Sequence, residues 1–157
     1  MNKHLEILEF PKLLARLAQH TTFAPGKELA LRLRPSPHLA QVQTRQAETT
    51  EACRLLAERP ELSLTSARDV RPYPERARRG IILPAEELLQ IRQTLITARD
   101  FQRSLIRLAE TYPLLADIAN RVDPCTGLVN EISNAIDERA EVKSSASSAL
   151  ARIRREI

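Results

Sequence analysis

Glycine is the residue that most constrains this chain, because only three of its 157 residues are glycine. Hairpin turns mostly need glycine or asparagine at positive φ, so a fold built from many hairpins is disfavoured. The aromatic content of 3%, with no tryptophan, also removes most of the side chains that sheets and base-stacking platforms use. Leucine, alanine, glutamate and arginine, all strong helix formers, dominate instead. The sequence therefore predicts an all-α fold.

The charge of the chain is mildly positive and unevenly distributed. There are 24 Lys and Arg residues against 20 Asp and Glu residues, which gives a net charge of +4. Residues 1–80 carry a net charge of +5 and residues 81–157 a net charge of −1. A dedicated nucleic-acid binder is usually more basic. Twenty of the 24 cations are arginine, which suits bidentate contacts with phosphate but can also reflect the base composition of a genome.

Ten prolines mark where helices begin, because proline is tolerated in the first turn of a helix but breaks its interior. The longest predicted helix opens at Pro84 and runs to about Thr111. Its apolar side chains recur every three or four residues, as in a helix that buries one face. This core seam consists of Leu88, Ile91, Leu95, Ala98, Leu105 and Leu108, with Phe101 and Gln102 between its two parts.

Shorter helices are predicted on either side of this seam. They cover residues of about 3–9, 11–19, 24–33, 37–58, 74–79, 113–122 and 128–137. Gly80 should end the helix over 74–79, because the residue after a helix often has positive φ. The helix over 37–58 should bury Leu39, Val42, Ala52, Cys53 and Leu56. Cys53 and Cys125 are too few and too far apart for a disulfide framework or a metal knuckle, so both are predicted to be buried free thiols.

The last residues predict the start of a further helix. Ser144 or Ser147 should cap it, and Leu150, Ile153 and Ile157 fall at positions i, i+3 and i+7 of one face. The apolar stripe is unfinished at Ile157, with no glycine or proline to end the helix. We therefore expect the chain to be a fragment that is cut within a long helix.

The sequence contains no motif for catalysis, for a cofactor or for a metal ion. Gly26 and Lys27 resemble part of a phosphate-binding loop. The glycine five residues earlier and the hydroxyl residue after the lysine are absent, so the pair is predicted to begin a helix. His4, His20 and His38 share no ligand spacing with each other or with a cysteine. We expect no catalytic, cofactor-binding or metal-ligating residue in this chain.

The hydropathy of the chain bears on its location. The first residues, Met1–Glu6, lack the apolar core of a leader sequence. No segment approaches 18 consecutive apolar residues. We therefore expect a soluble, cytoplasmic protein without a membrane partner.

One group of basic residues, hereafter the arginine cluster, is the only candidate binding site in the sequence. It consists of Arg68, Arg71, Arg76, Arg78 and Arg79. Asp69 and Glu75 lie between them. Two interpretations stay open: solvated arginines that favour the C-terminal end of a helix dipole, or side chains that contact nucleic-acid phosphates. A second group, Arg152, Arg154 and Arg155, flanks the last apolar stripe as charges flank a coiled-coil seam.

Three blocks of sequence occur in an order and spacing that chance would not produce. The first is Leu8-Glu9-Phe10, Leu13, Leu17, Gly26-Lys27-Glu28-Leu29-Ala30 and Pro35. The second is Arg68-Asp69-Val70-Arg71-Pro72, Ala77, Gly80 and Leu83-Pro84-Ala85-Glu86-Glu87-Leu88. The third is Ile132, Ala135-Ile136-Asp137, Glu141-Val142, Ala146-Ser147, Leu150 and Ile153-Arg154-Arg155-Glu156-Ile157. In these blocks, which span nearly the whole chain, it resembles the MutS-two family, bacterial paralogues of MutS that suppress recombination.

Two positions depart from the family's pattern. Ala140 stands where the family usually has glycine, and Ser144 stands where it usually has aspartate. Both residues lie in the connection before the last predicted helix, so they bear directly on the geometry of that turn.

The resemblance implies that the chain is the amino-terminal, all-helical core or lever region of such a protein. Residues 1–143 would form the base of the lever, and residues 144–157 would begin a long lever helix that leads to a DNA clamp. The chain itself would not be an enzyme. ATP and Mg²⁺ would bind in a separate ATPase domain of the full-length protein, and such proteins usually have a nuclease-like domain as well.

In this interpretation the chain is a mechanical module that couples the state of the ATPase to the clamp. The resemblance implies DNA as the partner of the full-length protein, a homodimer, and in some members the ribosome. Two alternatives stay open for the chain itself. One is a helical protein–protein or dimerisation module, and the other is direct nucleic-acid binding through the arginine cluster.

Overall fold

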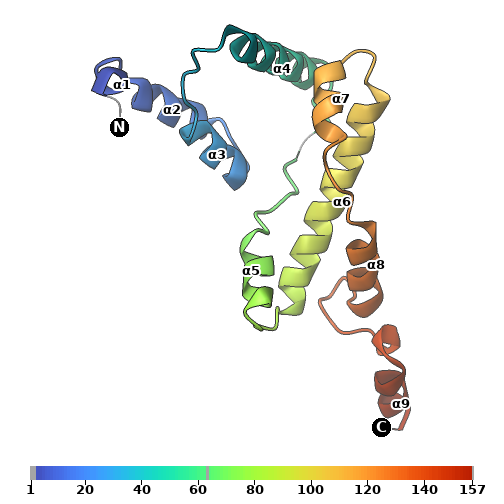
Figure 1. The fold of residues 1–157 in the computed structure, drawn as a ribbon. Helices are drawn as coiled ribbons and strands as arrows, with labels where there is room; N and C mark the ends of the chain where they lie inside the picture. Colours follow the sequence, from blue (N-terminus) through green and yellow to red (C-terminus); the bar gives the residue numbers. More distant parts are fainter. Residues whose placement is uncertain (1–2, 63, 157) are drawn as a thin grey trace. The chain divides into compact units, whose positions relative to one another are not determined.

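The computed structural model describes residues 3–62 and 64–156, and helices account for most of them (Figure 1). The chain divides into two compact units between Thr65 and Ser66, hereafter unit 1 and unit 2. In the described residues the only β-type pairing is one isolated bridge, between Ile136 and Val142. The predicted all-α fold is confirmed. None of the helices in the described ranges is long and apolar enough to cross a membrane.

The described residues of unit 1 form four helices and a small core. They are α1 (Lys3–Ile7), α2 (Phe10–Gln19), α3 (Ala24–Leu31) and α4 (Leu39–Glu58). Helices α2 and α3 pack against each other, and α1 packs against α2. The buried apolar side chains of this unit are Leu14, Ala18, Ala30 and Leu55. Gly26 and Lys27 lie in the first turn of α3, as the sequence predicts.

The predicted buried stripe of α4 is wrong. Leu39, Cys53 and Leu56 are exposed, and Leu55 is the buried side chain of this helix. The helix also begins two residues later than the sequence predicts, at Leu39. Within the described part of unit 1, α4 packs extensively against no other helix, so most of its apolar positions have no neighbour to cover them.

Unit 2 is built on one long helix. Its elements are α5 (Pro72–Arg78), α6 (Ala85–Arg107), α7 (Pro113–Ala119), α8 (Thr126–Ala135), the single 3₁₀ turn η1 (Ser144–Ala146) and α9 (Ser148–Glu156). Helices α7 and α8 both pack against α6 (Figure 1). The predicted core seam is confirmed, because Ile91 and Leu105 are buried and its other members are at least half-buried.

Helix α6 ends at Arg107 rather than near Thr111. Residues 108–111 form turns instead, in which the backbone N–H of Leu108 bonds to the carbonyl of Leu105 and that of Thr111 to the carbonyl of Leu108. A proline follows at position 113, and the residue before a proline avoids the helical region, so the chain turns here into α7. The amide of Gln102 donates to the carbonyls of Ala119 at 2.9 Å and Val122 at 2.7 Å, which satisfies acceptors at the end of α7.

The last helix, α9, begins after a serine cap. The hydroxyl of Ser147 accepts a hydrogen bond from the backbone N–H of Leu150 at 3.1 Å, so Ser147 is the cap and Ser144 lies in η1. Leu150 is half-buried and Ile153 is 49% exposed. Ile157, the last member of the predicted stripe, lies outside the described residues.

Candidate functional site

Helix α5 and the segment before it run antiparallel to the first half of α6. In the described residues, hydrogen bonds join them at three points, and the residue number rises on one side as it falls on the other. They are Arg68 N–H to Thr94 Oγ1 at 3.0 Å, Tyr73 hydroxyl to Gln90 Oε1 at 2.7 Å, and Arg76 Nη1 to Glu87 Oε1 at 2.6 Å. The backbone that carries the arginine cluster is therefore held along one edge of α6.

Two members of the arginine cluster are held in close ion pairs. Arg71 donates two hydrogen bonds to the carboxylate of Asp69, from Nε at 2.8 Å and from Nη2 at 2.7 Å. The hydrogen bond from the Arg71 side chain lowers the pKa of Asp69 below its ordinary value. Arg76 is held by Glu87 of α6. Because these pairs neutralise the guanidinium groups, both arginines act first as links within the fold.

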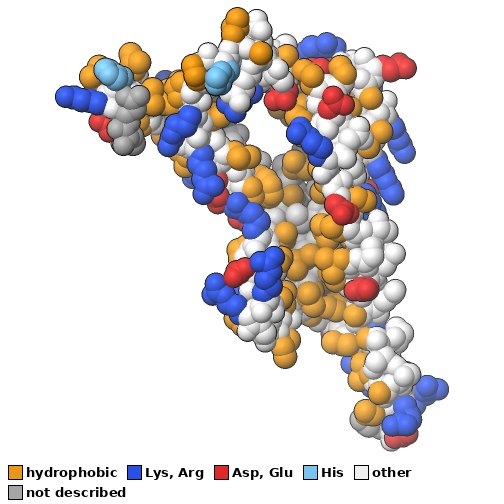
Figure 2. Space-filling model, in the orientation of Figure 1, with side chains coloured by type: hydrophobic (Ala, Val, Ile, Leu, Met, Phe, Trp, Pro, Cys, Tyr) orange, Lys and Arg blue, Asp and Glu red, His pale blue; other side chains and the backbone are white. Residues whose placement is uncertain are grey.

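Arg78 and Arg79 are held more loosely. Their side chains are 80% and 71% exposed, and they share one carboxylate, that of Glu75, at 3.4 and 3.2 Å. Exposed pairs of this kind contribute little to stability, so both side chains can turn to another anion. Figure 2 shows Lys and Arg side chains gathered over α5 with an acidic side chain among them.

Gly80 ends α5 as the sequence predicts. Its φ is +78°, and its N–H bonds to the carbonyl of Ala77 at 2.9 Å, while the N–H of Ile81 bonds to the carbonyl of Arg76 at 3.1 Å. The last turn of α5 therefore carries Arg76 and Arg78, where a helix dipole favours cations. Arg68 lies before the helix and is exposed. The five arginines share one edge of unit 2, in two different environments.

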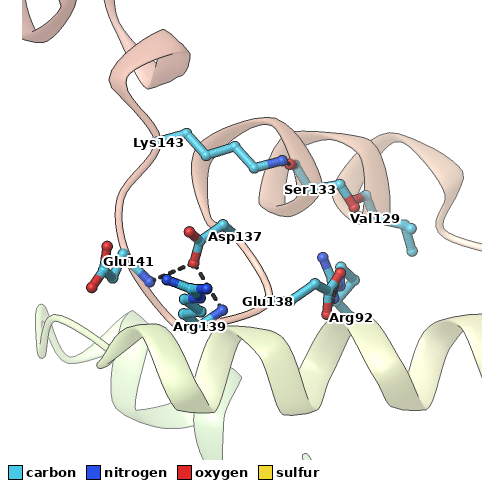
Figure 3. A network of polar contacts seen from close by, with 8 residues as sticks. All are labelled: Arg92, Val129, Ser133, Asp137, Glu138, Arg139, Glu141 and Lys143. Atoms are coloured by element: carbon cyan, nitrogen blue, oxygen red, sulfur yellow. Dashed lines mark hydrogen bonds and ion pairs between the residues drawn. The ribbon is translucent and has the colours of Figure 1, made fainter.

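An ion pair that the sequence interpretation missed joins α6 to the loop after α8. Nη2 of Arg92 donates to both carboxylate oxygens of Glu138 at 2.7 Å (Figure 3). The Arg92 side chain is 10% exposed and that of Glu138 is 84% exposed. A signal was present in the sequence, because Arg92 lies four residues after Leu88 and three before Leu95, on the apolar face of α6.

The loop from Ile136 to Lys143 is tightly organised, and is hereafter the α8–η1 loop. Oδ1 of Asp137 accepts hydrogen bonds from the backbone N–H groups of Arg139 and Glu141, each at 2.9 Å (Figure 3). The backbone N–H of Lys143 bonds to the carbonyl of Ala135 at 2.8 Å, and its ammonium group donates to the carbonyl of Ser133 at 2.7 Å. The loop is thus closed on itself and fastened to the end of α8.

Ala140 adopts the left-handed conformation within this loop, with φ of +63°. Only glycine takes this conformation without a steric penalty from a Cβ atom. Glycine, which the resemblance leads us to expect at this position, would take the conformation of Ala140 without this penalty.

Protonating Asp137 should loosen the α8–η1 loop. Hydrogen bonds from the backbone of Glu141 and then of Arg139 hold the pKa of Asp137 below its ordinary value. Because the pKa is lower in the folded state, the stabilisation is fully present above the unfolded-state pKa and is lost as the pH falls through the folded-state pKa. A ¹³C NMR titration of this carboxyl group, with the amide shifts of Arg139 and Glu141, checks the prediction.

The matched variant for this titration is Asp137→Asn, which keeps an acceptor oxygen but cannot titrate. The amide shifts of Arg139 and Glu141 should lose their acid dependence in this variant. A carboxyl pKa at or above the ordinary value for aspartate would contradict the prediction.

The described residues do not fit the ATP and Mg²⁺ that the resemblance places in a separate domain. Gly26 and Lys27 lie inside a helix rather than in a phosphate-binding loop. Across residues 3–62 and 64–156, no three or more His, Cys, Asp and Glu side chains are grouped so that they could hold a metal ion.

Comparison with curated proteins identifies relatives over the whole chain. A protein of Halothermothrix orenii named Endonuclease MutS2 is 34% identical over 98% of this chain and 20% of its own length. Its namesake from Symbiobacterium thermophilum is 37% identical over 96% of this chain and 19% of its own length. The chain belongs to the MutS2 family. Another MutS2 protein, from Halalkalibacterium halodurans, is 30% identical over 100% of this chain and 20% of its own length.

The chain spans about a fifth of the length of the MutS2 relatives that it matches. No protein-family model matches it. Alignment with individual MutS2 proteins over nearly every residue of the chain confirms the predicted family.

Proposed function

We propose that the chain is a mechanical module of a MutS-family protein that acts on DNA. In this proposal the residues up to 143 form a helical base, and residues 144–157 begin a lever that leads toward a DNA clamp. Membership of the MutS2 family supports a role connected with DNA. The core seam along α6 supports a rigid base, because a well-packed helix moves as one body.

The observation that carries this proposal is the way α9 is attached. It packs chiefly against η1, and η1 packs against α8, so a short connection joins the last helix to the base (Figure 1). Rigid elements that are joined by a short connection can transmit a motion from one site to another. A lever requires this combination of a fixed base and a distinct arm.

The activity and the partners of the whole protein are part of the same proposal. The relatives are named endonucleases, and we propose that the full-length protein is an ATPase, with ATP and Mg²⁺ in another domain, and an endonuclease. Its proposed partners are DNA, a second copy of itself and, in some family members, the ribosome. Its proposed location is the cytoplasm.

A second candidate function is direct contact with DNA phosphates by part of the arginine cluster. The exposure of Arg78 and Arg79 and their shared, loose partner Glu75 favour these two residues for that role. Arg71 and Arg76, which are in close ion pairs, are disfavoured. These exposures and ion pairs support Arg78 and Arg79 for the proposed contact more than Arg71 and Arg76.

DNA binding by residues 1–157 tests both functions in one experiment. For a mechanical module we expect weak binding of duplex or junction DNA, with a Kd of about 1–100 μM that weakens with salt, as for contacts with the backbone alone. The paired change Arg78→Ala and Arg79→Ala should reduce the slope of log K against log salt by about 0.9 for each contact that is lost. Fluorescence anisotropy at several salt concentrations measures this slope.

The matched control is the paired change Arg71→Gln and Arg76→Gln, which also removes two charges. Its salt slope should equal that of the unchanged chain. If both double variants had the same salt slope as the unchanged chain, the arginines would be solvated helix-end charges that do not contact DNA. Sub-micromolar binding that is insensitive to salt would contradict the mechanical module.

A further inference from the structure

Helix α9 depends on the α8–η1 loop for its position. Its contacts run through η1, where Nη1 of Arg154 donates to the hydroxyl of Ser144 at 3.1 Å. The chain reaches η1 directly from Lys143, the last residue of the loop. Whatever holds the loop against the base therefore also influences the direction in which α9 leaves it.

The loop behaves as one body because its internal bonds cross it at several points. The isolated bridge between Ile136 and Val142 closes it, and the Asp137 carboxylate fixes the turn between them. The backbone of Asp137 also donates to the carbonyl of Glu141 at 2.9 Å. A displacement of Glu138 would thus be passed on to Lys143 rather than absorbed within the loop.

Arg92 is the charged group through which α6 holds this loop. Its side chain is almost fully buried, and its Nε has no hydrogen-bond partner among the described residues, so both Glu138 contacts come from Nη2. Removing one partner of a buried ion pair leaves an uncompensated charge, which is strongly unfavourable. Glu138 is exposed and can be solvated without Arg92. The buried guanidinium group of Arg92 requires a counter-charge, and this requirement holds Glu138 and its loop in place.

We propose that Arg92 and Glu138 are positioning residues that set the direction of α9 relative to α6. The proposal rests on the proposed function, in which α9 begins the lever. When the pair is intact, the loop and η1 form a fixed link between the two helices. When the pair is broken, α6 and α8 keep their structure, and the loop with α9 samples several directions.

The test measures the distance between α6 and α9 in the chain of residues 1–157. Spin labels are placed on cysteines introduced at the exposed positions Gln93 and Arg152, after Cys53→Ser and Cys125→Ser remove the native thiols. Pulsed electron–electron double resonance then gives the distribution of distances between the two spin labels. The change Glu138→Gln should widen this distribution about two-fold, as expected when a fixed link becomes a hinge.

Two further variants make the result specific. Glu141→Gln changes an exposed carboxylate of the same loop and should leave the distribution unchanged. Arg92→Met places an apolar side chain on the apolar face of α6, which buried sites of this kind tolerate, and should widen the distribution as Glu138→Gln does. Circular dichroism confirms that the helices remain in each variant.

The outcomes separate the two proposals. A narrow distribution in the unchanged chain that stays narrow in Glu138→Gln and Arg92→Met would overturn the positioning role and leave the lever in place. Equal widening in Glu141→Gln would also overturn it, because the effect would not depend on the ion pair. A broad distribution in the unchanged chain would contradict the lever itself.

Discussion

Replacing Tyr112 with alanine is expected to lower the free energy of unfolding of unit 2 by about 3–5 kcal/mol, as for other large aromatic side chains removed from a core. Tyr112 is the largest fully buried side chain of the described residues, with 2% of its surface exposed. It lies directly before α7, and its backbone joins two helices. Its N–H bonds to the carbonyl of Leu108 at 2.8 Å, and its carbonyl accepts from Ala116 at 3.0 Å.

The size of the expected effect follows from the complete burial of the Tyr112 side chain. Helix α7 packs against α6, and the side chains of Ala116 and Ala119 on α7 are buried as well. Removal of a fully buried phenol ring leaves a cavity that the surrounding side chains fill only in part, and its packing contacts are lost. Chemical denaturation measures the loss of unfolding free energy, and hydrogen exchange of the α6 and α7 amides assigns that loss to unit 2.

A matched change in the helix that directly follows Tyr112 is Ile118→Ala. Ile118 is 37% exposed, so its removal takes less apolar surface out of the core, and we expect a loss below about 1.5 kcal/mol. If Tyr112→Ala were no more damaging than Ile118→Ala, the buried Tyr112 side chain would not be part of the stable core of unit 2.

Replacing Ala140 with glycine is expected to stabilise unit 2 by about 1 kcal/mol. The φ of +63° at Ala140 brings its Cβ close to the following carbonyl, and glycine removes that atom. Glycine also has more freedom to lose on folding, which offsets part of the gain. The rest of the loop keeps its hydrogen bonds, because they come from the backbone and from Asp137.

The control for this change is Ala149→Gly in the first turn of α9. Alanine there is helical and exposed, so glycine should destabilise the helix rather than stabilise it. Thermal unfolding of the three proteins gives the comparison. An Ala140→Gly protein that is less stable than the unchanged chain would show that the left-handed conformation carries no penalty here.

Periodicity was sufficient to predict the parts of the fold that one helix determines by itself. The seam of α6 and the end of α5 at Gly80 follow from residue spacing and from the conformational freedom of one glycine. The pattern of α4 misled, because an apolar stripe does not say whether another helix covers it. Leu55 is buried there and its neighbour Leu56 is exposed: the two point to different faces of the helix, and tertiary contacts decide which face is covered.

The candidate site shows the same limit. The arginine cluster could be found in the sequence, and Arg71 pairs with its near neighbour Asp69, but the ion pair of Arg76 depends on Glu87, which lies on another helix. Arg92 and Glu138 are 46 residues apart, and no local pattern joins them. The departure at Ala140 was visible in the sequence, and its meaning required the backbone conformation.

The two native thiols lie in different units and differ in reactivity. Cys53 is exposed on α4, whereas Cys125 is half-buried before α8, and burial together with Asp123 raises the pKa of the Cys125 thiol. Because the thiolate is the species that reacts, a maleimide dye should modify Cys53 first and leave Cys125 for a second dye. The two thiols are therefore separate attachment sites for a donor dye on unit 1 and an acceptor dye on unit 2, as an energy-transfer measurement requires.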